Sequence, residues 1–172
     1  MDKKEKPILF NEPMVRAICA GNKTMTRRVV KTPADTKRFC VGDMLWVRET
    51  FAKTSHGEYI YRADPVMESK WMGKWTPSIH MPREAARIFL EVTGVRVELL
   101  REITLGDSIR EGFIEPYRWA EQESLDTKII EMGNKWPLWQ VFTQWNDIYG
   151  KGYRWKNNPH VMVVEFRKAE HE

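Results

Sequence analysis

Cysteine is scarce in this sequence, with only Cys19 and Cys40 among 172 residues. Two cysteines are too few for a disulfide framework, and Cys19 falls on a predicted helix, where a buried thiol is expected. The four histidines are scattered along the chain, at His56, His80, His160 and His171. Because no pair of them has the spacing of metal ligands, the sequence predicts no metal site, and it indicates no cofactor.

Long apolar runs are also lacking. No stretch approaches the ~20 apolar residues that a membrane-spanning helix needs. The N-terminal segment MDKKEKPILF is charged and has no apolar core of the kind found in secretion signals. The chain contains no internal repeat and no low-complexity segment. We therefore expect a cytoplasmic protein whose 172 residues can form one domain with a real core.

Acidic residues are slightly outnumbered, which gives a formal net charge of +4. A mildly basic chain is compatible with nucleic-acid binding, although many basic proteins bind none. Tryptophan, in contrast, is abundant, with eight in the chain. A tryptophan ordinarily packs in a core, and stacking on nucleobases is the functional alternative.

The N-terminal part predicts a strand, a helix and a turn. Residues 7–10 have the pattern of a short strand, and Asn11 can cap a helix with proline in its first turn. Gly21 stands where a helix C-terminal glycine belongs. The segment AGNKTMTRR, residues 20–28, therefore begins as the helix ends, and Lys23 lies in the turn that follows.

The strand expected over residues 45–52 carries a carboxylate among apolar side chains. A period of two places on one face Leu45, Val47, Glu49 and Phe51. A charge at Glu49 needs a partner or a pocket, and a buried ion pair with Arg48 is one interpretation. A second strand over residues 58–63 follows a hairpin turn.

The strand region over residues 87–100 changes its apolar phase. Before Gly94 the alternating apolar residues are Ile88, Leu90 and Val92, and after it they are Val95, Val97 and Leu99. A slip of one residue turns every side chain to the other face, and a glycine at the slip is typical of a bulge or a barrel corner. We expect one long bent strand, or two strands meeting at a corner, in a small curved barrel.

The remaining elements complete an α+β order. A short helix is expected over residues 105–112 and a final strand over 160–166. An amphipathic helix is expected over 136–149, and its apolar face would consist of Leu138, Phe142 and Trp145. Irregular segments occupy 64–83 and 113–136. This order predicts an α+β fold around a barrel.

Several of these features together carry a family resemblance. AGNKTMTRR holds Gly21, Lys23 and Arg28 in the spacing GxKxxxxR. Further features follow in order: VGD at 41–43, the pair Glu111-Gly112, the terminal strand at 161–166, and the blocks LWVRETFA, YRAD, WTPSIHMPR and WKNNPHVMVVEF. In this combination the chain resembles, over nearly its whole length, ASCH domain proteins of the PUA-like superfamily, of the longer type found in bacteriophages and prophages.

The resemblance implies a single ASCH, PUA-like domain over residues 1–172, a small curved β-barrel with flanking helices and insertions around 64–83 and 113–136. PUA-like domains commonly bind RNA or modified nucleobases. Some small ASCH proteins are amidohydrolases that remove the acetyl group of N4-acetylcytidine, others are reported as nucleases, and phage versions are sometimes labelled morphogenetic proteins. RNA or a modified nucleoside is therefore the expected partner.

The catalytic positions of the small amidohydrolases match Lys23, Thr26 and Glu111 in this chain. Amide hydrolysis needs a nucleophile, a base and an acid. Thr26 offers a hydroxyl, and Lys23 could be the base if burial and nearby cations lower its pKa. Alternatively, Lys23 stays charged and Glu111 activates a water. Lys23 and Thr26 would face opposite sides of an extended strand, so they meet only if the segment turns.

A second group of residues is expected to contact the substrate or nucleic acid: Arg27, Arg28, Trp46, Arg48, Tyr61, Trp75 and His80. Either arginine next to Thr26 could stabilise an oxyanion, and the aromatic residues could stack on a base. The ordinary alternatives are a solvated cluster of cations at a helix end, core tryptophans and a histidine that bonds its own loop.

The leading hypothesis is a nucleotide- or RNA-directed protein that hydrolyses the amide of N4-acylated cytidine. A non-catalytic module that binds RNA or a modified base is the first alternative. A phage ribonuclease and a phage assembly or host-interaction protein are the others.

Overall fold

The computed structural model describes residues 5–64, 73–113 and 136–169. The chain divides into two compact units. Unit 1 comprises residues 1–21, 39–94 and 165–172, and unit 2 comprises residues 22–38 and 95–164. The prediction of a single domain with two insertions stays a prediction.

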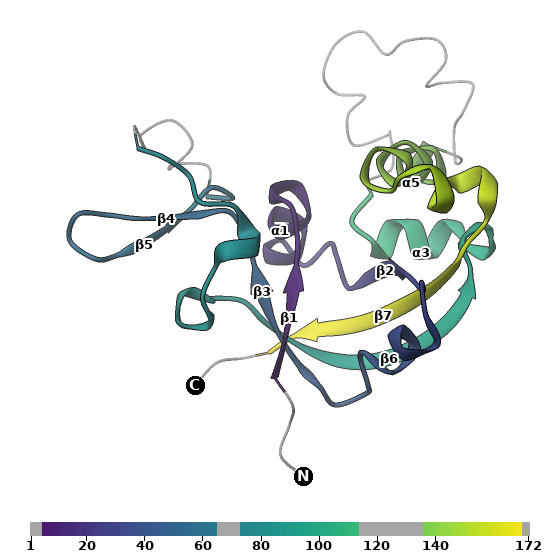
Figure 1. Ribbon diagram of the computed structural model, residues 1–172, viewed down its shortest axis with the longest axis horizontal. Helices are drawn as coiled ribbons and strands as arrows, with labels where there is room; N and C mark the ends of the chain where they lie inside the picture. The colour runs from purple at the N-terminus through teal and green to yellow at the C-terminus, as the bar shows by residue number, and fades with distance from the viewer. Residues whose placement is uncertain (1–4, 65–72, 114–135, 170–172) are drawn as a thin grey trace, which may run out of the picture. The chain divides into compact units, whose positions relative to one another are not determined.

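The structure has a mixed α+β composition, which confirms the expected fold class (Figure 1). The strands are β1 (Glu5–Leu9), β2 (Met25–Val29), β3 (Met44–Arg48), β4 (Phe51–Lys53), β5 (Tyr59–Tyr61), β6 (Phe89–Leu99) and β7 (His160–Lys168). The α-helices among the described residues are α1 (Glu12–Cys19), α3 (Leu105–Arg110) and α5 (Trp136–Ile148). Short 3-10 helices connect several of these elements.

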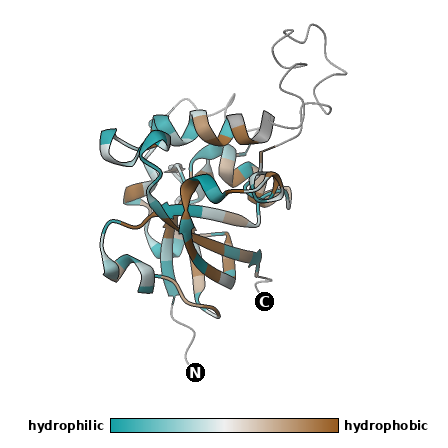
Figure 2. Ribbon diagram, turned by 90° about the vertical axis from the view of Figure 1, so that its right-hand side faces the viewer, coloured by the Kyte–Doolittle hydropathy of each residue, from teal (hydrophilic) through white to brown (hydrophobic). Residues whose placement is uncertain are grey.

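Five strands form one sheet in the order β1-β3-β6-β7-β2, and β4 and β5 form a separate antiparallel hairpin. β1 runs parallel to β3, and β3 runs antiparallel to β6, with Leu45 opposite Leu90. In this order β1 and β2 are the two ends, so the described strands do not show a closed barrel. Hydrophobic residues lie on the strands of the sheet, as the brown stretches in Figure 2 show.

The helix α1 forms where its capping residues predict it. The Asn11 side chain accepts a hydrogen bond from the Met14 amide at 3.1 Å, and Gly21 follows the helix with φ +76°. Val15 and Ile18 form its buried face. Cys19 is exposed, so the expectation of a buried thiol is wrong, because α1 ends at this residue and its packing face is already complete.

The strand β6 continues through Gly94 without interruption, in agreement with one long strand. A Cβ atom on Gly94 would lie 3.3 Å from Glu165 Oε2, so glycine permits a close approach there. The prediction that the buried face moves to the positions of Val95, Val97 and Leu99 beyond Gly94 is wrong, because Val97 is 46% exposed. The alternate positions Arg96 and Glu98 are partly buried and form ion pairs, which replaces apolar packing on that face.

Each unit has its own apolar cluster. In unit 1 the buried members are Phe51, Met81 and Ala85. In unit 2 they are Met25, Leu100, Trp145, Val161 and Val163. The helix α5 buries Val141 with Trp145, whereas Phe142 is 38% exposed, so the apolar face predicted for this helix is wrong at Phe142.

None of the described helices is both long and apolar enough to cross a membrane. The cytoplasmic location stays a prediction.

Candidate functional site

Lys23 and Glu111 lie together in unit 2. Residues 22–24 pair with the end of α3: Lys23 and Glu111 form an isolated antiparallel bridge, and the Thr24 amide donates to the Arg110 carbonyl at 2.8 Å. Gly112, with φ +92°, lets the chain turn directly after Glu111. Backbone pairing thus brings two residues that are far apart in the sequence to one place.

The Lys23 side chain is completely buried, with 0% of its surface exposed. Its Nζ donates to the carbonyl oxygens of Met25, at 2.8 Å, and Glu111, at 2.9 Å. The Glu111 carboxylate oxygen Oε2 lies 3.9 Å away. Burial lowers the pKa of Lys23 to about 8; Glu111 opposes this shift, and Arg28 and Arg27 reinforce it. Lys23 is therefore a lysine with a substantial neutral fraction in mildly alkaline solution.

Arg27 lies at the centre of a buried ion cluster. Its guanidinium donates to Glu111 Oε1 at 2.5 Å, to Glu98 Oε1 at 2.6 Å and to Asp107 Oδ2 at 2.9 Å. Arg96 joins the last two carboxylates, at 2.8 Å to Glu98 and 3.1 Å to Asp107. We call these five residues, with Lys23, the unit 2 ion cluster. The Glu111 carboxylate is thus held between Arg27 and Lys23.

This geometry gives Arg27 a different set of partners from the one expected. The sequence predicted a contact with substrate or nucleic acid, but the guanidinium is buried and its donors are directed at protein carboxylates. A carboxylate next to an arginine keeps its charge, and although burial opposes it, Arg27 lowers the pKa of Asp107. The role of Arg27 in the structure is to position the carboxylates around it.

Sequence reasoning missed Glu98 and Asp107. Two local signals could have pointed to them. Glu98 stands with Arg96 at inward positions of a strand. Asp107 follows Thr104 in a capping box, where the Asp107 amide donates a hydrogen bond to the Thr104 hydroxyl oxygen at 3.1 Å. Neither signal identifies Arg27 as the partner of these two carboxylates.

Thr26 is buried, with 1% of its surface exposed, on the strand β2. Because side chains alternate along a strand, it lies on the face opposite Met25 and Arg27. Lys23 Nζ nevertheless reaches the peptide group that joins Met25 to Thr26, since it donates to the Met25 carbonyl. The structure therefore brings Lys23 to Glu111 and to the backbone next to Thr26.

Glu49 forms a second buried ion pair, in unit 1. Arg87 contacts it through two hydrogen bonds, at 2.9 and 3.0 Å, and also binds Asp64. The interpretation of an ion pair with Arg48 is therefore wrong, because the buried side chain of Glu49, the residue that follows β3, is directed to Arg87. The Arg87 guanidinium also lies 3.9 Å from the centre of the Tyr61 ring. Burial raises the pKa of Glu49, and Arg87 opposes this shift.

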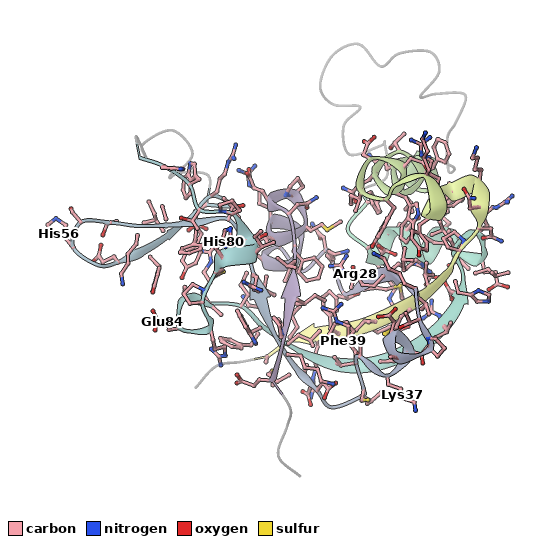
Figure 3. All side chains as sticks on the ribbon, viewed as in Figure 1. Arg28, Lys37, Phe39, His56, His80 and Glu84 are labelled. Carbon is pink, nitrogen blue, oxygen red and sulfur yellow. The ribbon has the colours of Figure 1, made fainter. Side chains whose placement is uncertain are left out.

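Among the other predicted contact residues of unit 1, Arg48 and Trp46 lie together. The Arg48 guanidinium lies 5.5 Å from the Trp46 ring and donates to the Ile79 carbonyl. Trp75 is half-buried, and His80 is exposed at the end of a 3-10 turn (Figure 3). The predicted residues are thus divided between the units: Lys23, Thr26, Arg27, Arg28 and Glu111 belong to unit 2, and the rest belong to unit 1.

No group of three metal-binding side chains occurs among the residues that the structure describes. The buried carboxylates of unit 2 are partnered by Arg27, Arg96 and Lys23. The fold and this site together define an α+β protein with a buried lysine–carboxylate centre.

A crystal structure of an ASCH domain from Lactobacillus crispatus JV V101 is similar to this chain, with a TM-score of 0.47 and 11% sequence identity. The alignment covers 98% of this chain and 81% of that one. No protein-family model and no curated protein matches the sequence.

Proposed function

We propose that this chain is a nucleotide- or RNA-directed protein of the ASCH type that hydrolyses the amide of an N4-acylated cytidine. The observation that carries this proposal is the Lys23 amine, buried between two carbonyls and the Glu111 carboxylate with a pKa of about 8. Burial and neighbouring charge commonly adjust the pKa of catalytic groups in this way. The motif match of Lys23, Thr26 and Glu111 supports the same assignment.

The chemistry follows from these residues in two steps. The neutral Lys23 amine takes the proton of the Thr26 hydroxyl, and the Thr26 oxygen attacks the acyl carbon. The carbon–nitrogen bond breaks, the leaving cytosine amine receives a proton from Lys23, and water then hydrolyses the acyl ester on Thr26. In the alternative route, Lys23 stays protonated, and Glu111 takes a proton from a water that attacks the acyl carbon directly. The carbon–nitrogen bond then breaks, and Glu111 passes the proton to the leaving cytosine amine, so that the acyl group leaves as the carboxylic acid.

We expect the wild-type protein to release acetate from N4-acetylcytidine, with kcat rising with pH through about 8 as Lys23 loses its proton. The measurement is incubation with a panel of acylated nucleosides at pH 6 to 10, read by mass spectrometry. A rate that does not rise between pH 7 and 9 favours the route through Glu111. Failure of every acylated nucleoside to react contradicts the amidohydrolase proposal.

The same proposal includes the subtype of ASCH protein and the barrel architecture. We propose that the chain is of the longer ASCH type found in phages and prophages, and that its sheet is the basis of a PUA-like barrel. The motif order from AGNKTMTRR to the terminal strand supports this assignment. RNA or a modified nucleoside is its proposed partner.

A non-catalytic binding module is the second candidate, and exposed cations in unit 2 favour it. Lys31, in the loop before the 3-10 helix Pro33–Lys37, and Lys37, the last residue of that helix, are both exposed. Figure 3 labels Lys37 together with Arg28, which is half-buried on β2. Cations at a surface bind phosphates and release counterions, which makes affinity depend on salt.

If these cations bind RNA, affinity for a labelled single-stranded RNA should fall as salt rises, and Lys31→Gln should reduce the salt slope by about one. Lys74→Gln, an exposed lysine of unit 1, is the matched control and should leave the slope unchanged. Fluorescence anisotropy between 50 and 300 mM salt (roughly the range over which such contacts weaken) measures both. An affinity that is independent of salt argues against this candidate.

A further inference from the structure

Unit 2 contains a pocket that none of the residues discussed for hydrolysis lines. Its volume is about 420 Å³, within the range of about 300–1,000 Å³ that is usual for small-molecule sites. Residues of α5 and of the segment after it form its walls, and they are Phe142, Asn146, Asp147, Arg154, Trp155 and Lys156. We propose that this pocket binds one nucleotide unit, with the base against the aromatic side chains and the phosphate at the two cations.

The walls of the pocket are held in place by contacts within unit 2. The Trp155 amide donates to Asn146 Oδ1 at 3.0 Å, which fastens the segment to α5. The Trp155 ring meets Phe142 edge to face, with ring centres 5.9 Å apart. The Arg101 guanidinium donates to the Lys156 carbonyl at 3.1 Å. A ligand would therefore enter a site whose backbone and aromatic wall are already positioned.

The chemistry of the lining fits a nucleotide. Phe142 is 38% exposed although it is a large apolar side chain, which offers a surface on which a base can pack. Arg154 and Lys156 flank Trp155 in the sequence and are both exposed. In the described part of the chain neither of them forms an ion pair, so both can bind a phosphate. Asp147 can accept a hydrogen bond from an amino group of the base.

The pocket proposal is independent of the hydrolysis proposal. Lys23, Thr26 and Glu111 do not line the pocket, and no step at the lysine–carboxylate centre uses its residues. A protein without amidohydrolase activity could still bind a nucleotide here. Conversely, an active hydrolase without binding at this pocket would leave the assignment of Lys23 intact.

The experiment uses the full chain with two kinds of ligand, free CMP and AMP and a fluorescein-labelled single-stranded RNA octamer. Saturation-transfer NMR follows the mononucleotides, and anisotropy follows the RNA. We expect Arg154→Gln to weaken binding roughly tenfold, because it removes a charge-assisted phosphate contact. Phe142→Ala should weaken it roughly fivefold by removing the stacking wall. Lys151→Gln removes an equal charge from an exposed residue outside the pocket and should change affinity less than about twofold.

The two ligands distinguish the source of the nucleotide. Pocket-dependent binding of CMP or AMP identifies a free nucleotide, and pocket-dependent binding of the RNA alone identifies one unit of a strand. Absence of binding for both ligands at millimolar concentration overturns the proposal. An equal loss for Arg154→Gln and Lys151→Gln also overturns it, since that result means non-specific attraction to positive charge. Thermal melting of each variant shows that the comparison is between folded proteins.

Discussion

Arg27→Leu is expected to lower the free energy of unfolding by about 3–5 kcal/mol. The substitution removes the cation from a buried site in which Glu98, Asp107 and Glu111 accept its hydrogen bonds. The positive charges of Arg96 and Lys23 cannot balance the negative charges of three carboxylates that are buried away from water and have lost their main partner. Since burial of an uncompensated charge is costly, the carboxylates would have to take up protons or the end of α3 would have to open.

Chemical denaturation with urea, followed by circular dichroism, measures this effect. The matched control is Lys37→Leu, which makes a similar change at an exposed cation and should stay within about 0.5 kcal/mol of the wild type. If Arg27→Leu loses less than about 1 kcal/mol, Arg27 is not the main partner of the three carboxylates. A variant too unstable to purify at neutral pH agrees with the expectation. Partial recovery at acidic pH would then show that the carboxylates cause the instability, because their protonation removes the unpaired charge.

Lys23→Met is expected to lower kcat for an acylated cytidine by ~10²-fold or more, because the base is lost. Methionine keeps most of the side-chain volume, but the carbonyls of Met25 and Glu111 lose their donor. The cost of leaving them unpaired is about 1–3 kcal/mol, which is smaller than the effect expected for Arg27. The variant should therefore remain folded below its melting temperature while its turnover falls.

The kinetics of this variant separate a catalytic role from a structural one. Wild type and Lys23→Met are compared in kcat and KM at pH 8, with thermal melting as a test of folding. Lys53→Met, an exposed lysine of unit 1, is the control and should keep kcat within about twofold. A Lys23→Met variant with wild-type kcat rules out Lys23 as the base. A variant that loses RNA affinity, in a protein that releases no acetate at all, makes the binding module the better explanation.

Local sequence patterns predicted most of the secondary structure. The cap at Asn11, the turn at Gly21 and the turn at Gly112 after α3 depend on residues within one helical turn of each other. The β4–β5 hairpin likewise follows from a short turn between alternating strands. β2 was missed because MTRRV combines apolar and charged residues without a clear period, and its strand conformation comes from its place in the sheet.

The sequence by itself determined the α+β class, the local turns and the presence of a charged residue in an apolar strand phase at Glu49. Only the tertiary structure decided which charges meet. Arg27 contacts Glu111 from 84 residues away and Glu98 from 71, and Glu49 contacts Arg87 from 38. These pairs depend on sheet register and on the position of α3, and no local pattern contains either. Burial of Lys23 in unit 2 lowers its pKa, and Arg28 and Arg27 reinforce this shift; the sequence motif can suggest such a lysine, but only the three-dimensional arrangement buries it.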